Sequence, residues 1–315
     1  MGSVKRRFFL YLLLLTFGFV SCSSAPDSAT SPTSSPTSIG NNDPKTLKVG
    51  AIPDQDPEKL QRLYGKVAKY LEKELKIPVA YRPVTDYAAA VTAFKVGALD
   101  LVWFEGLTGV QARLQVPGAK AIAQRDIDKN FHSVFIANKK SGIQPTLNVQ
   151  KGLVNLKGHT FTFGSESSTS GRLMPQFFLQ QAGVKLEDFK GEVGFSDSHD
   201  ATLELVQAGT YDAGAMNEQV WESHLQEGKA DANKVNLIWR TPAYHDYHWV
   251  IHPSVSDRFG KDFTQKVQNA FLKLDPKDKD QREILELFGA EKFIKTQDSN
   301  YAQIEKIGRE IGKIK

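Results

Sequence analysis

One pattern of strand and helix signals occurs twice in the 315-residue sequence and constrains the fold more than any other feature. In the first half, Thr85–Ala88 begins a predicted helix, and Gly97–Asp100 ends it and leads into an apolar strand. In the second half, His199–Thr202 and Gly209–Asp212 occupy the corresponding places. A Gly-x-x-Asp turn alone is common in α/β proteins, but here it recurs in a matched context. The chain is therefore predicted to form two similar α/β lobes.

The rest of the sequence alternates in the same way between strand and helix signals. Apolar runs predict strands at 47–52, 79–84, 99–104, 119–123, 133–137, 159–163, 192–195, 212–216, 235–239 and 249–252. Apolar residues at helical spacing predict helices at 57–75, 86–94, 107–114, 170–182, 200–208 and 217–227, with Asp56, Asp86 and Asp200 as caps. This order favours parallel sheets with helices on both faces, followed by a mostly helical tail from Asp257 onward.

Two segments, Asn130–Ser133 and Tyr244–Trp249, are predicted to cross between the lobes. This assignment gives a first lobe of residues 46–132 and 248–315 and a second lobe of residues 133–247. In open α/β sheets, ligands bind beyond the carboxyl ends of the strands. Candidate ligand-binding residues are therefore those just after strands and in the first turns of helices, on the two sides of a cleft.

The first 22 residues have the form of an export signal. Lys5–Arg7 provides positive charge, and Phe8–Val20 is an apolar run shorter than the about 20 residues that a membrane span needs. The run ends beside Cys22, the only cysteine in the chain. This pattern predicts a lipoprotein signal peptide over residues 1–22 with Cys22 lipidated, although Phe19 stands where Leu is expected. An ordinary cleaved signal and a transmembrane anchor are the alternatives.

Residues 23–45 are rich in Ser, Thr and Pro and almost lack large apolar side chains. Such a segment buries too little apolar surface to offset the entropy that ordering would cost. It is predicted to be a disordered tether between the anchor and the globular part. The chain is therefore expected in a periplasmic or other extracytoplasmic location, attached to the membrane only through its lipid.

Composition and motif content argue against several classes of function. The formal net charge is +4 and is spread along the chain, so it forms no basic stripe typical of a nucleic-acid-binding protein. The sequence has no P-loop, no Gly-x-Ser-x-Gly nucleophile elbow and no His-Glu-x-x-His motif. His245 and His248 provide two possible metal ligands, but no third is apparent. We therefore expect no enzymatic activity, no cofactor and no metal.

The sharpest candidate site is the segment Ser167–Gly171, which follows the predicted strand 159–163 and begins a helix. The first turn of a helix has free backbone N–H groups and a positive dipole end, which together attract anions. The hydroxyls of Ser168, Thr169 and Ser170 would add donors without adding charge. A run of four hydroxyl residues before a glycine favours oxyanion binding over the alternative, an ordinary Ser/Thr helix cap.

Further candidates lie at corresponding points of the two predicted lobes. His199 comes just before the predicted cap Asp200, where it would donate to an anion, and Tyr87 is at the matching point of the first lobe. Each has a structural alternative, because a single histidine or tyrosine is often simply packed. Trp103 and Phe104, at the end of a predicted strand, are candidate walls of the cleft, with packing in the core as the alternative.

Seven segments taken together carry a resemblance to a known family. They are Leu47–Pro53, Thr85–Ala88, Leu99–Phe104, Phe131–Val134, Ser168–Gly171, Ser198–Ala201 and Asp212–Asn217. Over nearly all of the mature chain, the sequence resembles the phosphonate/phosphite-type periplasmic substrate-binding proteins of ABC transporters. That family includes relatives labelled as selenate-binding.

The resemblance implies a fold, a mechanism and a set of partners. The fold would be a type II periplasmic binding protein, with two α/β lobes joined by crossover strands and the ligand in the cleft between them, closing by hinge motion. The protein would capture a small tetrahedral oxyanion without chemical change and deliver it to a permease driven by an ATPase. It would act as a monomer and bind no nucleic acid. An enzyme or a sensor built on the same two-lobe scaffold is the alternative from another class.

The resemblance also implies roles for individual residues. Ser168, Thr169, Ser170, Tyr87 and His199 would hold the oxygens of the ligand. In the family's pattern, Asn217 and the two crossings also contribute to the site.

The sequence departs from that pattern in ways that narrow the ligand. Phe131 replaces a usual Tyr, and Gln219 and Tyr247 stand where binders of aminoalkylphosphonates are expected to have carboxylates. Glu105 stands where Gly is commoner, with no role that the resemblance explains. A compact oxyanion is therefore expected, namely phosphite, a small alkylphosphonate or an analogue such as selenate.

Overall fold

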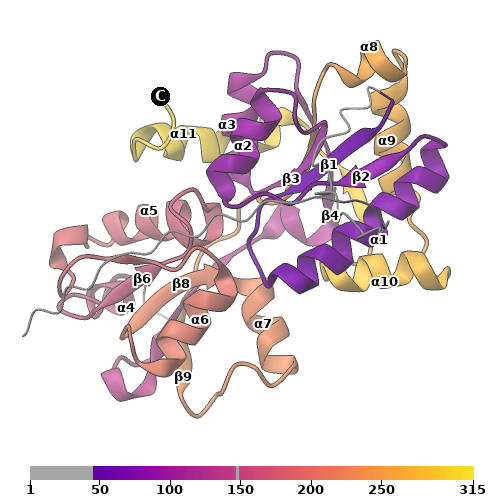
Figure 1. Ribbon diagram of the computed structural model, residues 1–315. Helices are drawn as coiled ribbons and strands as arrows, with labels where there is room; N and C mark the ends of the chain where they lie inside the picture. Colours follow the sequence, from indigo (N-terminus) through magenta and orange to yellow (C-terminus); the bar gives the residue numbers. More distant parts are fainter. Residues whose placement is uncertain (1–44, 147–148) are drawn as a thin grey trace, which may run out of the picture. The chain divides into compact units, whose positions relative to one another are not determined.

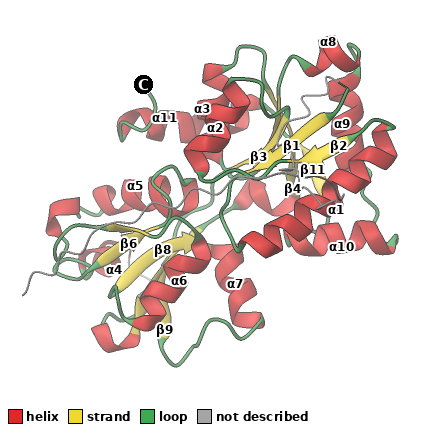
Figure 2. Ribbon diagram, in the orientation of Figure 1, coloured by secondary structure: helices red, strands yellow, loops and turns green. Residues whose placement is uncertain are grey.

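The computed structural model describes residues 45–146 and 149–315 (Figure 1). The predicted signal peptide, the lipidation of Cys22 and nearly all of the predicted tether lie outside the described residues. The described strands belong to two separate sheets, each flanked by helices (Figure 2). We call the first sheet with its helices the first lobe, and the second sheet with its helices the second lobe.

The sheet of the first lobe has six strands. In spatial order they are β11 (Phe293–Lys295), β4 (Lys120–Arg125), β10 (His248–Ile251), β3 (Leu101–Phe104), β1 (Leu47–Ala51) and β2 (Val79–Tyr81). β1 pairs in parallel with β2 and β3, whereas β10 is antiparallel to β3 and β4, and β11 is antiparallel to β4. The sheet is mixed rather than parallel as expected, because β10 brings the chain back from the second lobe in the opposite direction.

The sheet of the second lobe has five strands. In spatial order they are β7 (Gly194–Phe195), β6 (Phe161–Phe163), β8 (Ala213–Asn217), β5 (Ser133–Asn138) and β9 (Val235–Arg240). β6 is parallel to β7 and β8, and β5 is antiparallel to β8 and β9. As in the first lobe, the strand that follows a crossing runs antiparallel to its neighbours; here that strand is β5.

The two crossing segments contact each other. Phe131 and Tyr244 form an isolated antiparallel bridge, with the backbone N–H of each donating to the carbonyl of the other at 2.9 Å. The ring centroids of the two residues are 6.2 Å apart. The two connections between the lobes therefore run side by side as a short pair of extended segments.

Asp56 and Asp86, the capping residues that the sequence indicated, start the first two helices of the first lobe. Within the described residues this lobe has seven α-helices. They are α1 (Pro57–Leu75), α2 (Tyr87–Lys95), α3 (Gly106–Gln115), α8 (Val255–Phe259), α9 (Phe263–Leu272), α10 (Lys279–Phe288) and α11 (Ala302–Glu310). The side chains of Asp56 and Asp86 accept hydrogen bonds from the third residue beyond them, at 2.9 and 2.7 Å. The tail after Asp257 is mostly helical as predicted, but it also supplies the edge strand β11, which sequence patterning missed.

The second lobe contains α4 (Val149–Val154), α5 (Met174–Gln181), α6 (His199–Ala208) and α7 (Glu218–Gln226). A single π-helical turn, Thr169–Leu173, precedes α5 without a break. The expectation that Asp200 caps α6 is wrong, because Ser198 stands three residues before Ala201 and accepts from its N–H at 3.2 Å. Asp200 instead pairs with Nε2 of His224 at 2.7 Å.

Within the described part of the chain, none of the helices has the length and apolarity that a membrane crossing requires.

Candidate functional site

The turn between β6 and α5 is a tight backbone arrangement built by two glycines. Gly164 N–H donates to the carbonyl of Gly171 at 2.9 Å, and Ser168 Oγ accepts from Gly171 N–H at 2.8 Å. A Cβ atom on Gly171 would lie 3.1 Å from Cα of Gly164, closer than most real contacts. The absence of side chains at both positions thus lets the π-helical turn pack onto the strand and fixes Ser168, Thr169 and Ser170, all of them buried.

These three residues, which we call the cradle, donate hydrogen bonds to one carboxylate, that of Glu105. Oε1 of Glu105 accepts from the hydroxyls of Ser168 at 3.2 Å and Ser170 at 2.9 Å. Oε2 accepts from the backbone N–H of Thr169 at 2.5 Å. Glu105 is the residue before the first turn of α3, so a carboxylate from the first lobe lies among the donors of the second. The arrangement shows that the cradle binds an anionic pair of oxygens.

The hydroxyl and the backbone of Thr169 make different contacts. Its Oγ1 accepts from the backbone N–H of Leu107 at 2.8 Å, so the side chain bonds the first turn of α3. The donor that Thr169 directs toward the carboxylate is its backbone N–H. Thr169 therefore both supplies the helix-end donor and connects the two lobes.

His199 occupies the first position of α6, and its ring is oriented by β8. The backbone N–H of Asn217 donates to Nδ1 at 3.4 Å, which places the ring proton of a neutral imidazole on Nε2. Nε2 lies 3.4 Å from both Ser170 Oγ and Glu105 Oε1. His199 therefore presents an N–H donor to the same point as the cradle.

The hydroxyl of Tyr247 lies between two carboxylates. It is 2.8 Å from Oδ2 of Asp54 and 2.9 Å from Oε1 of Glu105, and it accepts from Nδ2 of Asn217 at 3.1 Å. A phenol has one proton, so it can donate to only one of the two carboxylates at a time. Asn217 thus orients both His199 and Tyr247, in addition to capping α7 through Oδ1 at 3.1 Å from Val220 N.

Tyr87, at the first position of α2, is buried with an unsatisfied hydroxyl. Among the residues that the structure describes, its oxygen has no hydrogen-bond partner. Burial, and the negative charges of Glu105 and Asp54, raise the pKa of Tyr87 well above its usual value, although the nearby Ser168 hydroxyl, which forms no well-directed hydrogen bond with it, lowers that pKa, so the hydroxyl keeps its proton as a donor. A buried donor left unpaired costs free energy, which is a reason to expect that a ligand satisfies it.

The buried carboxylates differ in the direction of their pKa shifts. Burial tends to raise the pKa of Glu105, but the hydrogen bond and charge of His199, with donors of the cradle, outweigh it and leave that pKa below its usual value. Burial raises the pKa of Asp54 despite His199 and the hydrogen bond from Tyr247. Burial also raises the pKa of Asp246, which accepts from Gly106 N–H at 2.8 Å and caps α3 in place of Glu105. Glu105 is therefore the carboxylate held in the charged form.

An aromatic wall borders the cluster, but Phe104 is not part of it. Phe104 packs edge-on against Phe94 at 5.8 Å in the core of the first lobe, because neighbouring residues of a strand face opposite sides of the sheet. Trp103 takes the expected place, stacked on Tyr247 at 5.8 Å. Phe131 meets the Tyr247 ring edge-on at 5.4 Å.

Sequence patterning missed two buried residues of this region. Asp54 follows β1 by three residues, a position at the carboxyl end of a strand that could have marked it. Arg125 had the same signal, since it lies two residues beyond the predicted strand 119–123 and is the last residue of β4. Its guanidinium binds the carboxylate of Asp128 at 2.7 and 2.8 Å and lies 4.9 Å from the centre of the Tyr247 ring. Arg125 therefore supports the aromatic wall.

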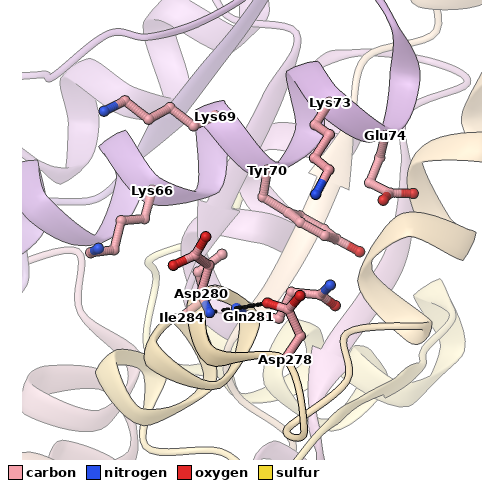
Figure 3. A pocket seen from close by; sticks show the side chains of 9 residues that line it. All are labelled: Lys66, Lys69, Tyr70, Lys73, Glu74, Asp278, Asp280, Gln281 and Ile284. Carbon is pink, nitrogen blue, oxygen red and sulfur yellow. Dashed lines mark hydrogen bonds between the residues drawn. The ribbon is translucent and has the colours of Figure 1, made fainter.

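Other features of the surface do not join this cluster. A hollow of about 360 Å³ lies between α1 and α10 and is bordered by Lys66, Tyr70 and Asp278 (Figure 3). The hydroxyl of Tyr70 donates to the carbonyl of Ala270 at 2.6 Å, and Lys66 pairs with Glu283. Within residues 45–146 and 149–315, no group of three or more His, Cys, Asp or Glu side chains is placed to hold a metal ion.

Two α/β lobes joined by paired crossings, with a buried set of hydrogen-bond donors where the lobes meet, are typical of a solute-binding protein. The chain belongs to the family of ABC transporter, phosphonate, periplasmic substrate-binding proteins, whose model matches residues 49–301. This membership confirms the resemblance and the two-lobed fold inferred from the sequence, and it places the chain in the periplasmic component of an ABC transporter.

Individual relatives agree with this assignment. The chain is 51% identical, over 87% of its length and 92% of the relative's, to the probable ABC transporter phosphite binding protein PhnD1 of Prochlorococcus marinus. The solved structure of that PhnD1 in complex with methylphosphonate has a TM-score of 0.84, covering 86% of this chain and all of the other. A binding protein component of an ABC phosphonate transporter from Pseudomonas aeruginosa, 22% identical with a TM-score of 0.72 over 83% of this chain and 85% of the other, shares the fold.

Proposed function

We propose that this chain captures a small tetrahedral oxyanion, phosphite or a small phosphonate such as methylphosphonate, and delivers it to an ABC permease. The observation that carries the proposal is the convergence of buried donors on one point. The cradle, His199 and the Tyr247 hydroxyl all bond or approach the carboxylate of Glu105, so they form a site suited to oxygen atoms bearing negative charge. The relative PhnD1, described as phosphite-binding and solved with methylphosphonate, supports the same ligand class.

The ligand would be held between residues of both lobes. Ser168, Ser170 and the N–H of Thr169 would bind its oxygens from the second lobe with His199, and Tyr87 would donate from the first. Asn217 would act by orienting His199 and Tyr247. Phe131 and Trp103 would hold the Tyr247 ring in place rather than bind oxygens. Binding would involve no catalytic step.

The partners and location follow from the same proposal. The chain would work as a monomer with a permease and an ATPase, bound to the membrane only through lipid on Cys22, which ends the signal peptide of residues 1–22. Residues 23–45 would be the tether, and residues 46–132 with 248–315, and 133–247, would be the two lobes that close on the ligand. Metabolic labelling with a fatty acid, with Cys22→Ser as control, tests the anchor.

Ser170→Ala tests the site, because the Ser170 hydroxyl bonds the Glu105 carboxylate and neither caps a helix nor joins α3. Calorimetry with methylphosphonate and phosphite should show affinity at least about tenfold weaker than in the wild type, since losing a charge-assisted hydrogen bond costs about 1.5–3 kcal/mol. Ser167→Ala is the matched control, because the Ser167 hydroxyl is not among the groups bonded to Glu105. Unchanged affinity in Ser170→Ala would refute the site, and no binding of either anion by the wild type would refute the function.

A further inference from the structure

Glu105 places a negative charge at the point where the oxygens of the proposed ligand would bind. Its carboxylate is fully buried, and its oxygens already accept from Ser170, Thr169 and Tyr247. An ionised carboxylate has only acceptor atoms, so it offers no proton to a second anion. Any oxyanion that binds the cradle must therefore displace the Glu105 carboxylate from these donors, and it then has beside it a negative group that can only receive hydrogen bonds.

The carboxyl group of Asp54 competes with Glu105 for the same donor. Oδ2 of Asp54 lies 2.8 Å from the Tyr247 hydroxyl, and the same hydroxyl is 2.9 Å from Oε1 of Glu105. The phenol proton can satisfy one of these acceptors, which leaves the other in need of a donor. A ligand that brings its own proton would supply the missing donor.

We propose that Glu105, with Asp54 beside it, makes the site specific for oxyanions that carry a proton. The inference rests on the proposed function and deepens it by defining the ligand class. Phosphite, methylphosphonate and phosphate all exist near neutral pH partly as monoanions with a P–O–H group, whose proton can be donated to a carboxylate. Selenate and sulfate have lost every proton at that pH, so their oxygens would face the carboxylate with no hydrogen between them. Such like-charge contact in a buried site is a strong penalty against the wrong ligand.

The charges of neighbouring elements do not remove this penalty. The groups that face the cluster are Asp54 after β1, Tyr87 on α2, Arg125 at the end of β4, Asp128 in the 3-10 turn that follows it, His199 on α6, and Asp246 and Tyr247 before β10. Of the two possible cations, Arg125 already binds both oxygens of Asp128. His199 contacts Glu105 itself at 3.4 Å. Positive charge near Glu105 is thus already engaged by carboxylates of the protein.

Calorimetry on the wild-type protein at several pH values tests the inference first. With methylphosphonate, the apparent affinity should fall about tenfold per pH unit once the pH exceeds that at which the free anion loses its last proton, because only the protonated form binds. Selenate and sulfate should give no binding heat at concentrations a hundredfold above the methylphosphonate Kd. Equal affinity for selenate and methylphosphonate, or a methylphosphonate affinity that stays level or rises with pH, would overturn the inference.

Glu105→Gln tests the residue assignment, because an amide keeps the shape of the side chain and supplies N–H donors. This variant should bind selenate measurably, reduce the preference for methylphosphonate over selenate at least tenfold and flatten the pH dependence. Glu166→Gln, an exposed change in the neighbouring loop, is the matched control and should leave the preference as in the wild type. An unchanged preference in folded Glu105→Gln would overturn the role of Glu105. If that variant does not fold, the pH dependence of methylphosphonate affinity in the wild type decides whether the inference stands.

The two proposals can fail separately. A wild-type protein that binds neither phosphite nor methylphosphonate would overturn the proposed function. A wild-type protein that binds these anions and selenate alike would leave the proposed function standing and remove only the requirement for a proton.

Discussion

Nδ1 of His199 accepts a hydrogen bond from the backbone N–H of Asn217, with the two nitrogens 3.4 Å apart. The contact joins the first turn of α6 to the end of β8, so the sheet of the second lobe sets the tautomer of the ring. With Nδ1 as acceptor, the neutral imidazole carries its proton on Nε2, which points at the cradle and Glu105. The backbone thereby turns a histidine into a fixed donor without requiring a positive charge.

His199→Ala should weaken methylphosphonate binding by about tenfold or more, because a buried hydrogen bond to an anion is lost. His199→Gln should recover part of the loss, since its amide can place an N–H group near the position of Nε2. Calorimetry measures both, and thermal unfolding in the absence of ligand shows whether either variant is folded. Equal affinity of His199→Ala and the wild type would contradict the donor role.

Tyr87 and Tyr244 are expected to respond in opposite ways to the same substitution. The buried Tyr87 hydroxyl has no partner among the described residues, whereas the Tyr244 hydroxyl lies 2.7 Å from Ser133 Oγ. Tyr87→Phe should therefore weaken ligand binding while leaving the free energy of unfolding unchanged or higher. Tyr244→Phe should lower that free energy by about 1 kcal/mol and leave affinity nearly unchanged.

Urea unfolding and calorimetry on the two Tyr variants separate stability from binding. A loss of stability in Tyr87→Phe with normal affinity would show that the hydroxyl serves the fold rather than the ligand.

The close packing of Gly171 on Gly164 predicts that a single methyl group there damages the site. In Gly171→Ala the new Cβ would lie 3.1 Å from Cα of Gly164 and from Oγ of Ser168, so the turn or the strand must shift. We expect destabilisation by about 1–3 kcal/mol and a clear loss of affinity. Gly65→Ala on α1 is the control, because nothing lies within 4 Å of the added carbon. The control should be neutral or up to about 1 kcal/mol more stable than the wild type, because alanine favours helix.

The sequence predicted the elements of the site well where local chemistry decides them. Asp56 and Asp86 act as the predicted caps. Ser168, in the hydroxyl run that follows a strand, also caps the π-helical turn, which was the structural alternative for that run. Local patterning cannot report which side of a strand end faces the cleft. Trp103 and Phe104 are both apolar and adjacent, and only the pleat of β3 places one beside Tyr247 and the other against Phe94.

Contacts between segments that are distant in sequence could not be predicted either, because local patterning carries no information about them. In the sequence, Glu105 was only a departure from the family's pattern, in which Gly is commoner. No neighbouring residue indicates that its carboxylate reaches the donors of residues 168–170. The mixed direction of the sheets was also missed, since it depends on where the chain re-enters each lobe after a crossing. The guanidinium of Arg125 packs near three aromatic rings that come from distant parts of the sequence, so its support of the aromatic wall could not be predicted from its neighbours in the chain.

The buried carboxyl of Asp246 predicts a pH dependence of stability. Burial and the nearby charge of Glu105 raise the pKa of Asp246 well above its usual value, despite the hydrogen bond from Gly106. The folded protein therefore keeps this proton at pH values where the unfolded chain, with an aspartate pKa of about 3.9, has lost it. Because the folded state binds more protons, the contribution of Asp246 to the free energy of unfolding becomes less favourable as the pH rises above about 4.

Asp246→Asn should remove that contribution, because the amide does not titrate and its oxygen can still accept from Gly106 N–H. The difference in unfolding free energy between variant and wild type should therefore move in favour of the variant between pH 4 and pH 7. Urea unfolding of the ligand-free proteins at the two pH values measures this difference, and comparison with the wild type cancels the titration of Asp54 and other groups. Asp257→Asn makes the same chemical change at an exposed position of α8 and should show a much smaller pH-dependent difference. A difference for Asp246→Asn that is the same at both pH values would show that Asp246 is ionised in the folded protein, and its carboxylate would then add to the negative charge that Glu105 places beneath the ligand.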